Sequence, residues 1–242
     1  MTIKVAVVGA TGRMGKLALD IIHGSQDLHL HAALDSKSEL AQAIGADVIF
    51  DVTNLEVSKQ VVEFGIAKGI KVLVGTSGWT KSALNQVEAN LSDSSAIVFV
   101  PNFSIGSVLA SKFAADAGKY FDSIEIIETH HAGKVDSPSG TAIRTAELIA
   151  DSRNEAGKTQ PLIPGVGQDA RGEVVAGVPI HSLRIDGVSA KQDVVLGGSA
   201  EVLTISHQTS SVQAYALGIL ESLKFTANAS GLVVGLDKVL GI

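Results

Sequence analysis

The sequence predicts an α/β protein that begins with a doubly wound parallel sheet and continues with an α+β domain whose sheet is largely antiparallel or mixed. Up to about residue 100, short runs rich in Val and Ile alternate with segments of helical period. From residue 174 to 207, strand-like runs follow one another across Gly-rich turns. A length of 242 residues with 45% hydrophobic content suffices for one large domain or two modest ones.

The elements of the first section follow from these patterns. Short apolar runs predict strands at residues 3–8, 28–35, 47–52, 70–75 and 96–100. Helical period predicts helices at residues 13–24, 55–69 and 80–91. A long helical stretch at 105–120 then leads to a strand at 123–129. This alternation is typical of parallel strands joined by crossover helices.

The pattern of predicted elements changes in the second half of the chain. Residues 151–173 are polar and rich in Gly and Pro, which predicts a surface loop, and strands are expected at 174–185, 188–198 and 200–208. Residues 211–225 have a helical pattern, and the apolar segment 231–242 must pack against the rest of the chain. We expect residues 1–103 and 211–242 to form the first domain and residues 104–210 the second.

Composition excludes several classes of function. The net charge is −6, and no run of Lys and Arg suggests a nucleic-acid or anionic membrane surface, so a small-molecule partner is expected. The absence of cysteine excludes disulfides, thiolate metal sites and cysteine nucleophiles. The N-terminal segment does not have the layout of a signal peptide, and no apolar stretch is long enough to span a membrane. We therefore expect a cytoplasmic protein.

A glycine-rich turn follows the first predicted strand. In "VAVVGATGRMG", Gly9, Gly12 and Gly15 lie between that strand and a helix, where backbone N–H groups and the helix dipole can hold a pyrophosphate. Asp35 ends the second strand and can bind the ribose hydroxyls of an adenosine. Strand, turn, helix, strand and acid in this order predict a Rossmann-like dinucleotide site. The alternatives are a tight turn at the glycines and a helix N-cap at Asp35.

Further cofactor contacts are expected along the same sheet edge, because ligands of such folds bind at the carboxyl ends of the strands. Two later strand ends carry Gly75, Thr76 and Ser77, and residues 100–103. Ordinary turn chemistry would explain these residues equally well. Arg13 could offset phosphate charge and, with Lys37, tolerate a 2′-phosphate.

Two reductase classes with a similar glycine turn are excluded. Semialdehyde and acyl-phosphate dehydrogenases need a cysteine thiolate, and this chain has no cysteine. Short-chain dehydrogenases use a Tyr followed four residues later by Lys, but Tyr120 and Tyr215 are followed at that spacing by Ile124 and Ile219. The remaining class is a reductase whose proton donor is His or Lys.

The segment "ETHHAGKVDSPSGTA" offers such donors. Period two places Glu128 and His130 on one face of a strand, so the carboxylate can orient an imidazole that acts as a general acid. His131 would point to the opposite face, which argues against a metal held by both histidines. Lys134 lies beyond the strand, where it could protonate a carbanion or enamine or hold an anion. We expect no metal.

A helix is expected directly after this loop. Ser137 or Ser139 can cap it, and the amides of Gly140 and Thr141 are then among its unpaired donors. Such a helix start is an anion site that suits a small substrate with carboxylates. The alternative is that the histidines are packed or surface residues, that Lys134 is solvated and that "SPSG" is only a helix cap.

With these residues in place, the chain resembles the dihydrodipicolinate reductase family, also called 4-hydroxy-tetrahydrodipicolinate reductases. The resemblance covers nearly the whole chain and rests on "GATGRMG", "GTSGW", "PNFSIG", "EIIETHHAGKVDSPSGTA" and "GLVVGLDKVLG". It implies reduction of 4-hydroxy-tetrahydrodipicolinate, via dihydrodipicolinate, to tetrahydrodipicolinate with NADH or NADPH, in lysine and diaminopimelate biosynthesis. It also implies a homotetramer whose core is built by the sheet of the second, substrate-binding domain.

The resemblance assigns roles to individual residues. His130 is implied to be the acid/base residue and Lys134 a proton donor, while His131, Gly140 and Thr141 bind the carboxylates of the cyclic imine substrate. The implied cofactor contacts are Gly9, Ala10, Thr11, Gly12, Arg13, Met14, Asp35, Gly75, Thr76, Ser77, Val100, Pro101, Asn102 and Phe103.

One departure from the family concerns the cofactor. Many relatives carry an arginine after the acidic residue, but Ser36 follows Asp35 here, so we expect NADH to be favoured while NADPH stays possible. Two rival functions remain open. One is another small Rossmann imine or amino-acid reductase, and the other is a protein that senses NAD(H) without turnover.

Overall fold

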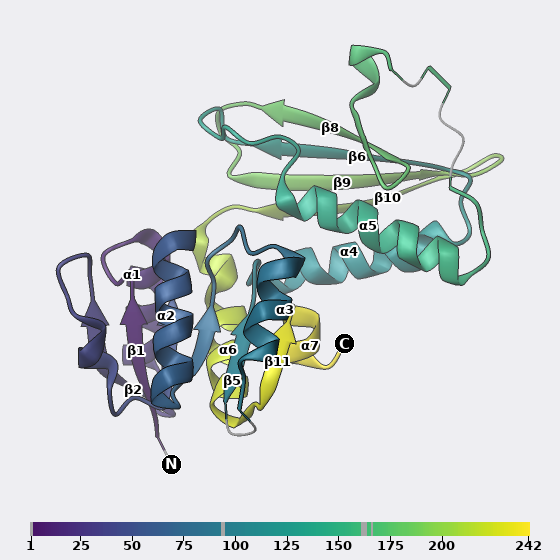
Figure 1. Cartoon of the computed structure of the whole chain (residues 1–242). Coiled ribbons are helices and arrows are strands. Elements are labelled where there is room, and N and C mark those ends of the chain that lie inside the picture. The colour runs from purple at the N-terminus through teal and green to yellow at the C-terminus, as the bar shows by residue number, and fades with distance from the viewer. Residues whose placement is uncertain (1, 93–94, 161–163, 166) are drawn as a thin grey trace. The chain divides into compact units, whose positions relative to one another are not determined.

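The computed structural model describes residues 2–92, 95–160, 164–165 and 167–242 (Figure 1). The chain divides into two compact units, the first made of residues 1–105 and 212–242 and the second of residues 106–211. Each unit has its own sheet. The first sheet is fully parallel and the second is mixed, which confirms the predicted fold class.

The first sheet has six strands in the order β11-β5-β4-β3-β1-β2. The strands are β1 (Ile3–Val8), β2 (Leu28–Leu34), β3 (Val48–Asp51), β4 (Lys71–Val74), β5 (Ala96–Phe99) and β11 (Gly231–Val234). The inner strands β3, β4 and β5 are almost completely buried, as expected of a parallel sheet covered on both faces. Strand β11 pairs with β5, so the apolar C-terminal segment completes this sheet.

Helices cover both faces of this sheet. They are α1 (Arg13–Gly24), α2 (Leu55–Lys68), α3 (Lys81–Ala89), α6 (Ala216–Asn228) and α7 (Leu236–Leu240), with short 3-10 turns at Leu40–Ala43 and Val212–Tyr215. Residues of α2 and α3, such as Val61 and Val87, share one core with Ala6 and Val8 of β1. Helices α1 and α6 contact each other and pack on the other face (Figure 1).

The second sheet has five strands in the order β10-β9-β6-β8-β7. The elements of this unit are α4 (Ile105–Gly118), β6 (Ser123–His130), α5 (Gly140–Glu155), a 3-10 turn at Asp169–Arg171, β7 (Glu173–Val175), β8 (Val178–Arg184), β9 (Ala190–Gly197) and β10 (Val202–Thr209). Strands β6 and β8 are parallel, and the other neighbouring pairs are antiparallel. One face of the sheet packs on α4 and α5 through a core that includes Ile124, Ile126, Ala146, Ile149 and Leu196.

One local prediction was wrong. Residues 151–155 were expected to open a surface loop, but they form the last turn and a half of α5. Arg153 explains this, because its guanidinium is buried and donates to the carbonyls of Gly118, Phe121 and Thr159. These tertiary hydrogen bonds outweigh the polar character of the local sequence. Residues 161–163 and 166 of the expected loop lie outside the described residues.

Candidate functional site

The glycine turn lies at the carboxyl edge of the first sheet, next to the point where the strand order reverses. Strand β1 is flanked by β2 on one side and β3 on the other, so Gly9 follows the strand at which the chain switches direction across the sheet. Dinucleotides bind at this position in folds of this type.

The turn has no room for side chains at two of its glycines. Gly9 has φ of 90°, and a Cβ there would lie 2.6 Å from the carbonyl oxygen of Val52. A Cβ on Gly15 would collide with the backbone of Gly9 and Ala10. The N-cap of helix α1 is Gly12, which has no side chain to cap the first amides, whereas α2 is capped by the side chain of Asn54. The result is a tight backbone cradle whose helix-start N–H groups suit a pyrophosphate.

Asp35 directly follows β2 at the same edge. Its Oδ1 accepts hydrogen bonds from the Lys37 amide at 2.9 Å and the Ser38 hydroxyl at 2.8 Å. These two hydrogen bonds lower the pKa of the exposed Asp35 carboxyl, so it is ionised near neutral pH. Asp35 therefore closes a turn rather than capping a helix, and it presents negative charge where an adenosine ribose would lie.

The other expected cofactor residues lie at the ends of β4 and β5, but they differ in accessibility. Val100 and Phe103 are buried, so their side chains pack inside the unit rather than line an open surface. The Phe103 ring lies over Gly75, where a Cβ would approach it to 2.8 Å. Thr76 is also buried, and its hydroxyl accepts a hydrogen bond from the amide of Thr53 at 2.9 Å.

A buried acid that was not predicted from the sequence also lies at this edge. Asp51 ends β3 and is fully buried, and its Oδ1 accepts hydrogen bonds from the hydroxyl and the amide of Thr53. Burial raises the pKa of the Asp51 carboxyl, although hydrogen bonds from Ser58, Thr53 and Thr76 act in the opposite direction. The signal in the sequence was an Asp inside an otherwise apolar strand, "VIFDV".

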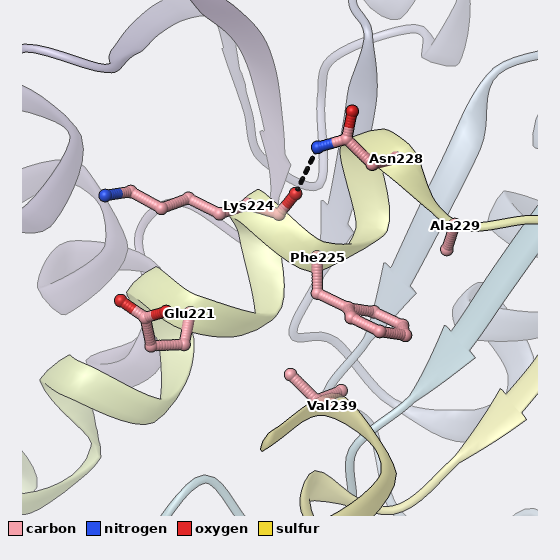
Figure 2. A pocket seen from close by; sticks show the side chains of 6 residues that line it. All are labelled: Glu221, Lys224, Phe225, Asn228, Ala229 and Val239. Atoms are coloured by element: carbon pink, nitrogen blue, oxygen red, sulfur yellow. Dashed lines mark hydrogen bonds between the residues drawn. The ribbon is translucent and has the colours of Figure 1, made fainter. Parts of the chain in front are cut away.

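A shallow hollow of about 390 Å³ lies elsewhere on this unit (Figure 2). It is lined by Glu221, Lys224, Phe225, Asn228, Ala229 and Val239. Nearby, Lys71 at the start of β4 donates to the carbonyl of Ala227, and Lys224 pairs with Asp27 just before β2. The hollow is therefore at the amino edge of the sheet, opposite the glycine turn, and it is not the candidate cofactor site.

In the second unit, His130 is the last residue of β6, and its Nδ1 lies 2.6 Å from Oε2 of Glu128. The expected same-face pairing of these two residues is confirmed. Glu128 is fully buried, and burial acts to raise its pKa. Hydrogen bonds from Arg184, Ser182 and His130 outweigh the burial and lower the pKa of the Glu128 carboxyl, so it is ionised.

Arg184 was also missed by the sequence analysis. It ends β8 and lies opposite His130 across the parallel pair of β6 and β8. Its guanidinium donates to both carboxylate oxygens of Glu128, at 2.9 and 3.0 Å. Residues 130 and 184 become neighbours only through strand pairing, so the sequence offered no local signal.

Lys134 lies in the turn after β6, and its Nζ is 2.7 Å from each carboxylate oxygen of Asp136. This pair was not anticipated. His131 lies just after the strand, which ends at His130, and it is exposed. His131 is therefore not a strand residue, so its direction relative to His130 is not set by strand alternation.

Helix α5 begins at Gly140, and its cap is Ser139 rather than Ser137. The Ser139 hydroxyl accepts from the amide of Ala142 at 3.2 Å, and the Ser139 amide donates to Oε1 of Glu128 at 3.1 Å. A Cβ at Gly140 would meet none of the described residues within 4 Å, so space is open above the helix start. Gly140 and Thr141 are the first two residues of α5, where the positive end of the helix dipole attracts an anion.

Two negative findings concern the residues that the structure describes. They contain no cluster of three or more His, Cys, Asp or Glu side chains arranged to hold a metal ion. Within the same ranges, every helix is too short or too polar to cross a membrane.

Comparison with known proteins points to one family. Two sequence models of that family, described as dihydrodipicolinate reductase N-terminus and C-terminus, match residues 3–103 and 106–240. The 4-hydroxy-tetrahydrodipicolinate reductase of Clavibacter sepedonicus is 53% identical over 242 residues, which cover 99% of this chain and 87% of that protein. The enzyme of the same name from Streptomyces griseus subsp. griseus is 42% identical over 246 residues, covering 99% of this chain and 98% of that protein.

A solved structure agrees with these relatives. The dipicolinate-bound dihydrodipicolinate reductase from Paenisporosarcina sp. TG-14 is 31% identical and superposes with a TM-score of 0.83. The match covers 98% of this chain and 99% of that one, so both units have counterparts in a single solved protein.

Proposed function

Because the chain belongs to the dihydrodipicolinate reductase family, we propose that it reduces 4-hydroxy-tetrahydrodipicolinate, via dihydrodipicolinate, to tetrahydrodipicolinate with NADH or NADPH. The product belongs to the diaminopimelate route to lysine. The observation that carries the proposal is the hydrogen bond between the buried Glu128 carboxylate and the His130 ring. The same carboxylate accepts from the amide of Ser139, so this pair lies next to the start of α5. Family membership favours this enzyme over another imine reductase or a protein that only senses NAD(H).

The first unit fits the cofactor. The glycine cradle at Gly9 and Gly15 would take the pyrophosphate at the uncapped start of α1, and the ionised Asp35 would hold the ribose. When bound, the dihydronicotinamide supplies the hydride of the reaction. Arg13, the first residue of α1, is positioned in sequence to offset phosphate charge.

The second unit supplies the substrate site in this proposal. One carboxylate of the cyclic imine binds the amides of Gly140 and Thr141, where the positive end of the α5 dipole adds to the attraction. The open space above Gly140 leaves room for it. The exposed imidazole of His131 adds a donor on the same loop.

His130 transfers the proton in this proposal. A carboxylate accepts hydrogen bonds but has no proton to donate, so the ionised Glu128 keeps a proton on Nδ1 of His130. Nε2 is then the atom that exchanges a proton with the substrate. Lys134 has three donors and uses two on Asp136, which leaves one N–H for the substrate. We propose His130 as the acid/base residue and Lys134 as a second donor.

Further parts of the proposal concern assembly and cofactor choice. We propose a cytoplasmic homotetramer, with residues 1–103 and 211–242 as the cofactor domain and 104–210 as the substrate and assembly domain. We also propose that NADH is preferred, since Asp35 is followed by Ser36 and its carboxylate repels a 2′-phosphate. The other proposed cofactor contacts, at residues 9–14, 75–77 and 100–103, lie along the same sheet edge.

A coupled assay tests the reaction. The product of an active dihydrodipicolinate synthase is supplied as substrate, and oxidation of NADH and NADPH is followed side by side. We expect turnover that depends on the synthase product. Absence of turnover with both cofactors, with the synthase shown to be active, would contradict the proposed function.

A further inference from the structure

Arg184, at the end of β8, makes hydrogen bonds with every nitrogen of its guanidinium. A guanidinium has five N–H donors in a fixed planar arrangement. The structure gives Arg184 five hydrogen bonds, to Lys134 O (3.3 Å), Leu183 O (2.7 Å), Asp136 O (2.7 Å), and the two Glu128 oxygens (2.9 and 3.0 Å). Every donor therefore already has a protein acceptor.

This count separates two roles that an arginine beside a carboxylate-binding site can have. An arginine that binds a substrate carboxylate needs free N–H groups directed at it. Arg184 would have to break hydrogen bonds to the buried Glu128 or to the loop in order to provide them. We propose that Arg184 is not a substrate ligand but a positioning residue, which together with Glu128 fixes His130 and the Lys134 loop in one rigid frame. This inference rests on the proposed reductase function.

Glu128 is the second half of this frame. Its Oε2 accepts from His130 and Arg184, and its Oε1 accepts from Arg184 and the Ser139 amide. Donors therefore surround both oxygens. A glutamine in its place would direct an amide N–H₂ group at one of these donors, so Glu128→Gln cannot keep all of the hydrogen bonds to this carboxylate.

The frame joins three separate pieces of backbone. Glu128 and His130 belong to β6, and Ser139 caps α5. Between them, the carbonyls of Lys134 and Asp136 accept from Arg184, so the guanidinium holds the backbone of both residues that form the loop's ion pair. The Arg184 guanidinium and the Glu128 carboxylate together contact the strand, the loop and the helix start. Weakening the hydrogen bonds of either group should therefore misplace His130 and Lys134 without removing them.

The kinetic test uses Arg184→Lys in the full-length protein. Lysine keeps the charge but cannot make five planar hydrogen bonds. We expect kcat to fall on the order of tenfold to a hundredfold, since small misplacements of catalytic groups cost this much. We expect KM for the substrate and Kd for dipicolinate, the ligand in the solved relative, to change by no more than about twofold.

Arg153→Lys is the matched control. Arg153 is a buried arginine of the same unit, and its hydrogen bonds go to the carbonyls of Gly118, Phe121 and Thr159, at the other end of α5. We expect this variant to lower the thermal unfolding temperature but to keep kcat. If Arg184→Lys keeps kcat and weakens dipicolinate binding about tenfold or more, Arg184 is a substrate ligand and the inference is wrong. An inactive wild-type protein would instead contradict the proposed function.

A spectroscopic test does not depend on turnover. With ¹⁵N-labelled histidine, the neutral form of the wild-type His130 ring should carry its proton on Nδ1. Glu128→Gln should lose this preference, while Glu125→Gln, which alters a pair on the opposite face of β6, should retain it. An unchanged tautomer in folded Glu128→Gln would overturn the role assigned to the carboxylate.

Discussion

Oε2 of the fully buried Glu128 lies 2.6 Å from Nδ1 of His130, at the end of strand β6. The carboxylate is ionised because Arg184 and the other donors around it outweigh the effect of burial on its pKa. In the proposed function, an ionised partner on Nδ1 leaves the other ring nitrogen for the substrate. The proposed proton-transfer group at the strand end is therefore oriented before any ligand binds.

The first prediction contrasts the two adjacent histidines. His130→Ala should lower kcat by on the order of a hundredfold or more, because it removes the general acid, and KM should change much less. His131→Ala should mainly raise KM, since its exposed ring is proposed to hold substrate charge. Steady-state kinetics on both variants checks this. An unchanged kcat for His130→Ala would remove that residue from the chemistry.

The second prediction concerns Lys134. Lys134→Ala should lower kcat by on the order of tenfold to a hundredfold with a smaller effect on KM, because a positioned donor is lost. Asp136→Asn tests the partner, since Asp136 holds the Lys134 ammonium through two 2.7 Å contacts. It should lower kcat less than Lys134→Ala does. A large rise in KM at constant kcat in Lys134→Ala would show that the lysine only binds the substrate.

Sequence reasoning predicted the elements that depend on local patterns. The parallel strands were visible as short Val- and Ile-rich runs, the strand-to-helix turn as three glycines, and the Glu128–His130 pair as a spacing of two along a strand. In each case the controlling interaction spans only a few residues. Local spacing is then enough to place the side chains on one face or in one turn.

The features that sequence reasoning missed depend on contacts between distant segments. Arg184 meets His130 only because β6 and β8 pair in a particular register, across 54 positions of the chain. The last residues of α5 stay helical because Arg153 reaches carbonyls on other segments. Asp51 becomes buried only when β3 is placed between β1 and β4. The contacts of Arg184 and Arg153 leave no local pattern in the sequence, and Asp51 is marked only as a charged residue in an apolar run.

The third prediction uses the raised pKa of Asp51. Its ordinary value is 3.8, and burial raises it in the folded protein. The stability that the protonated carboxyl contributes is therefore fully present below pH 3.8 and is lost as the pH rises through the raised pKa. The loss is about 1.4 kcal/mol for each unit by which the pKa is raised.

Asp51→Asn removes this titration. The free energy of unfolding of the variant, relative to wild type, should therefore increase as the pH is raised from about 4 to 7. Urea unfolding of both proteins at several pH values measures the difference, in which the effects of the other carboxylates cancel. A difference that stays constant over this range would show that Asp51 is not perturbed.

The fourth prediction compares two glycines of helix α1. Gly15→Ala places a methyl group against the backbone of Gly9 and Ala10, so it should weaken NADH binding at least about tenfold and cost about 1–3 kcal/mol of stability. At Gly24, the last residue of the helix, a Cβ would meet none of the described residues within 4 Å. Gly24→Ala should leave NADH binding unchanged and alter stability by less than about 1 kcal/mol. Fluorescence titration with NADH and thermal unfolding distinguish the two variants. Equal effects of both substitutions would argue against a cofactor site at the glycine turn.

The last prediction concerns cofactor choice at the end of β2. The exposed Asp35 carboxylate is ionised, because the Lys37 amide and the Ser38 hydroxyl lower its pKa, and it should repel the 2′-phosphate of NADPH. We expect wild-type kcat/KM to be higher with NADH than with NADPH. Ser36→Arg should raise kcat/KM with NADPH selectively, since a guanidinium beside the acid can pair with the phosphate. Asp35→Asn should reduce the preference by removing the repulsion while keeping an oxygen for the turn. If wild-type kcat/KM is clearly higher with NADPH, then Arg13 or Lys37 provides enough positive charge to accept the phosphate, and the carboxylate does not decide specificity.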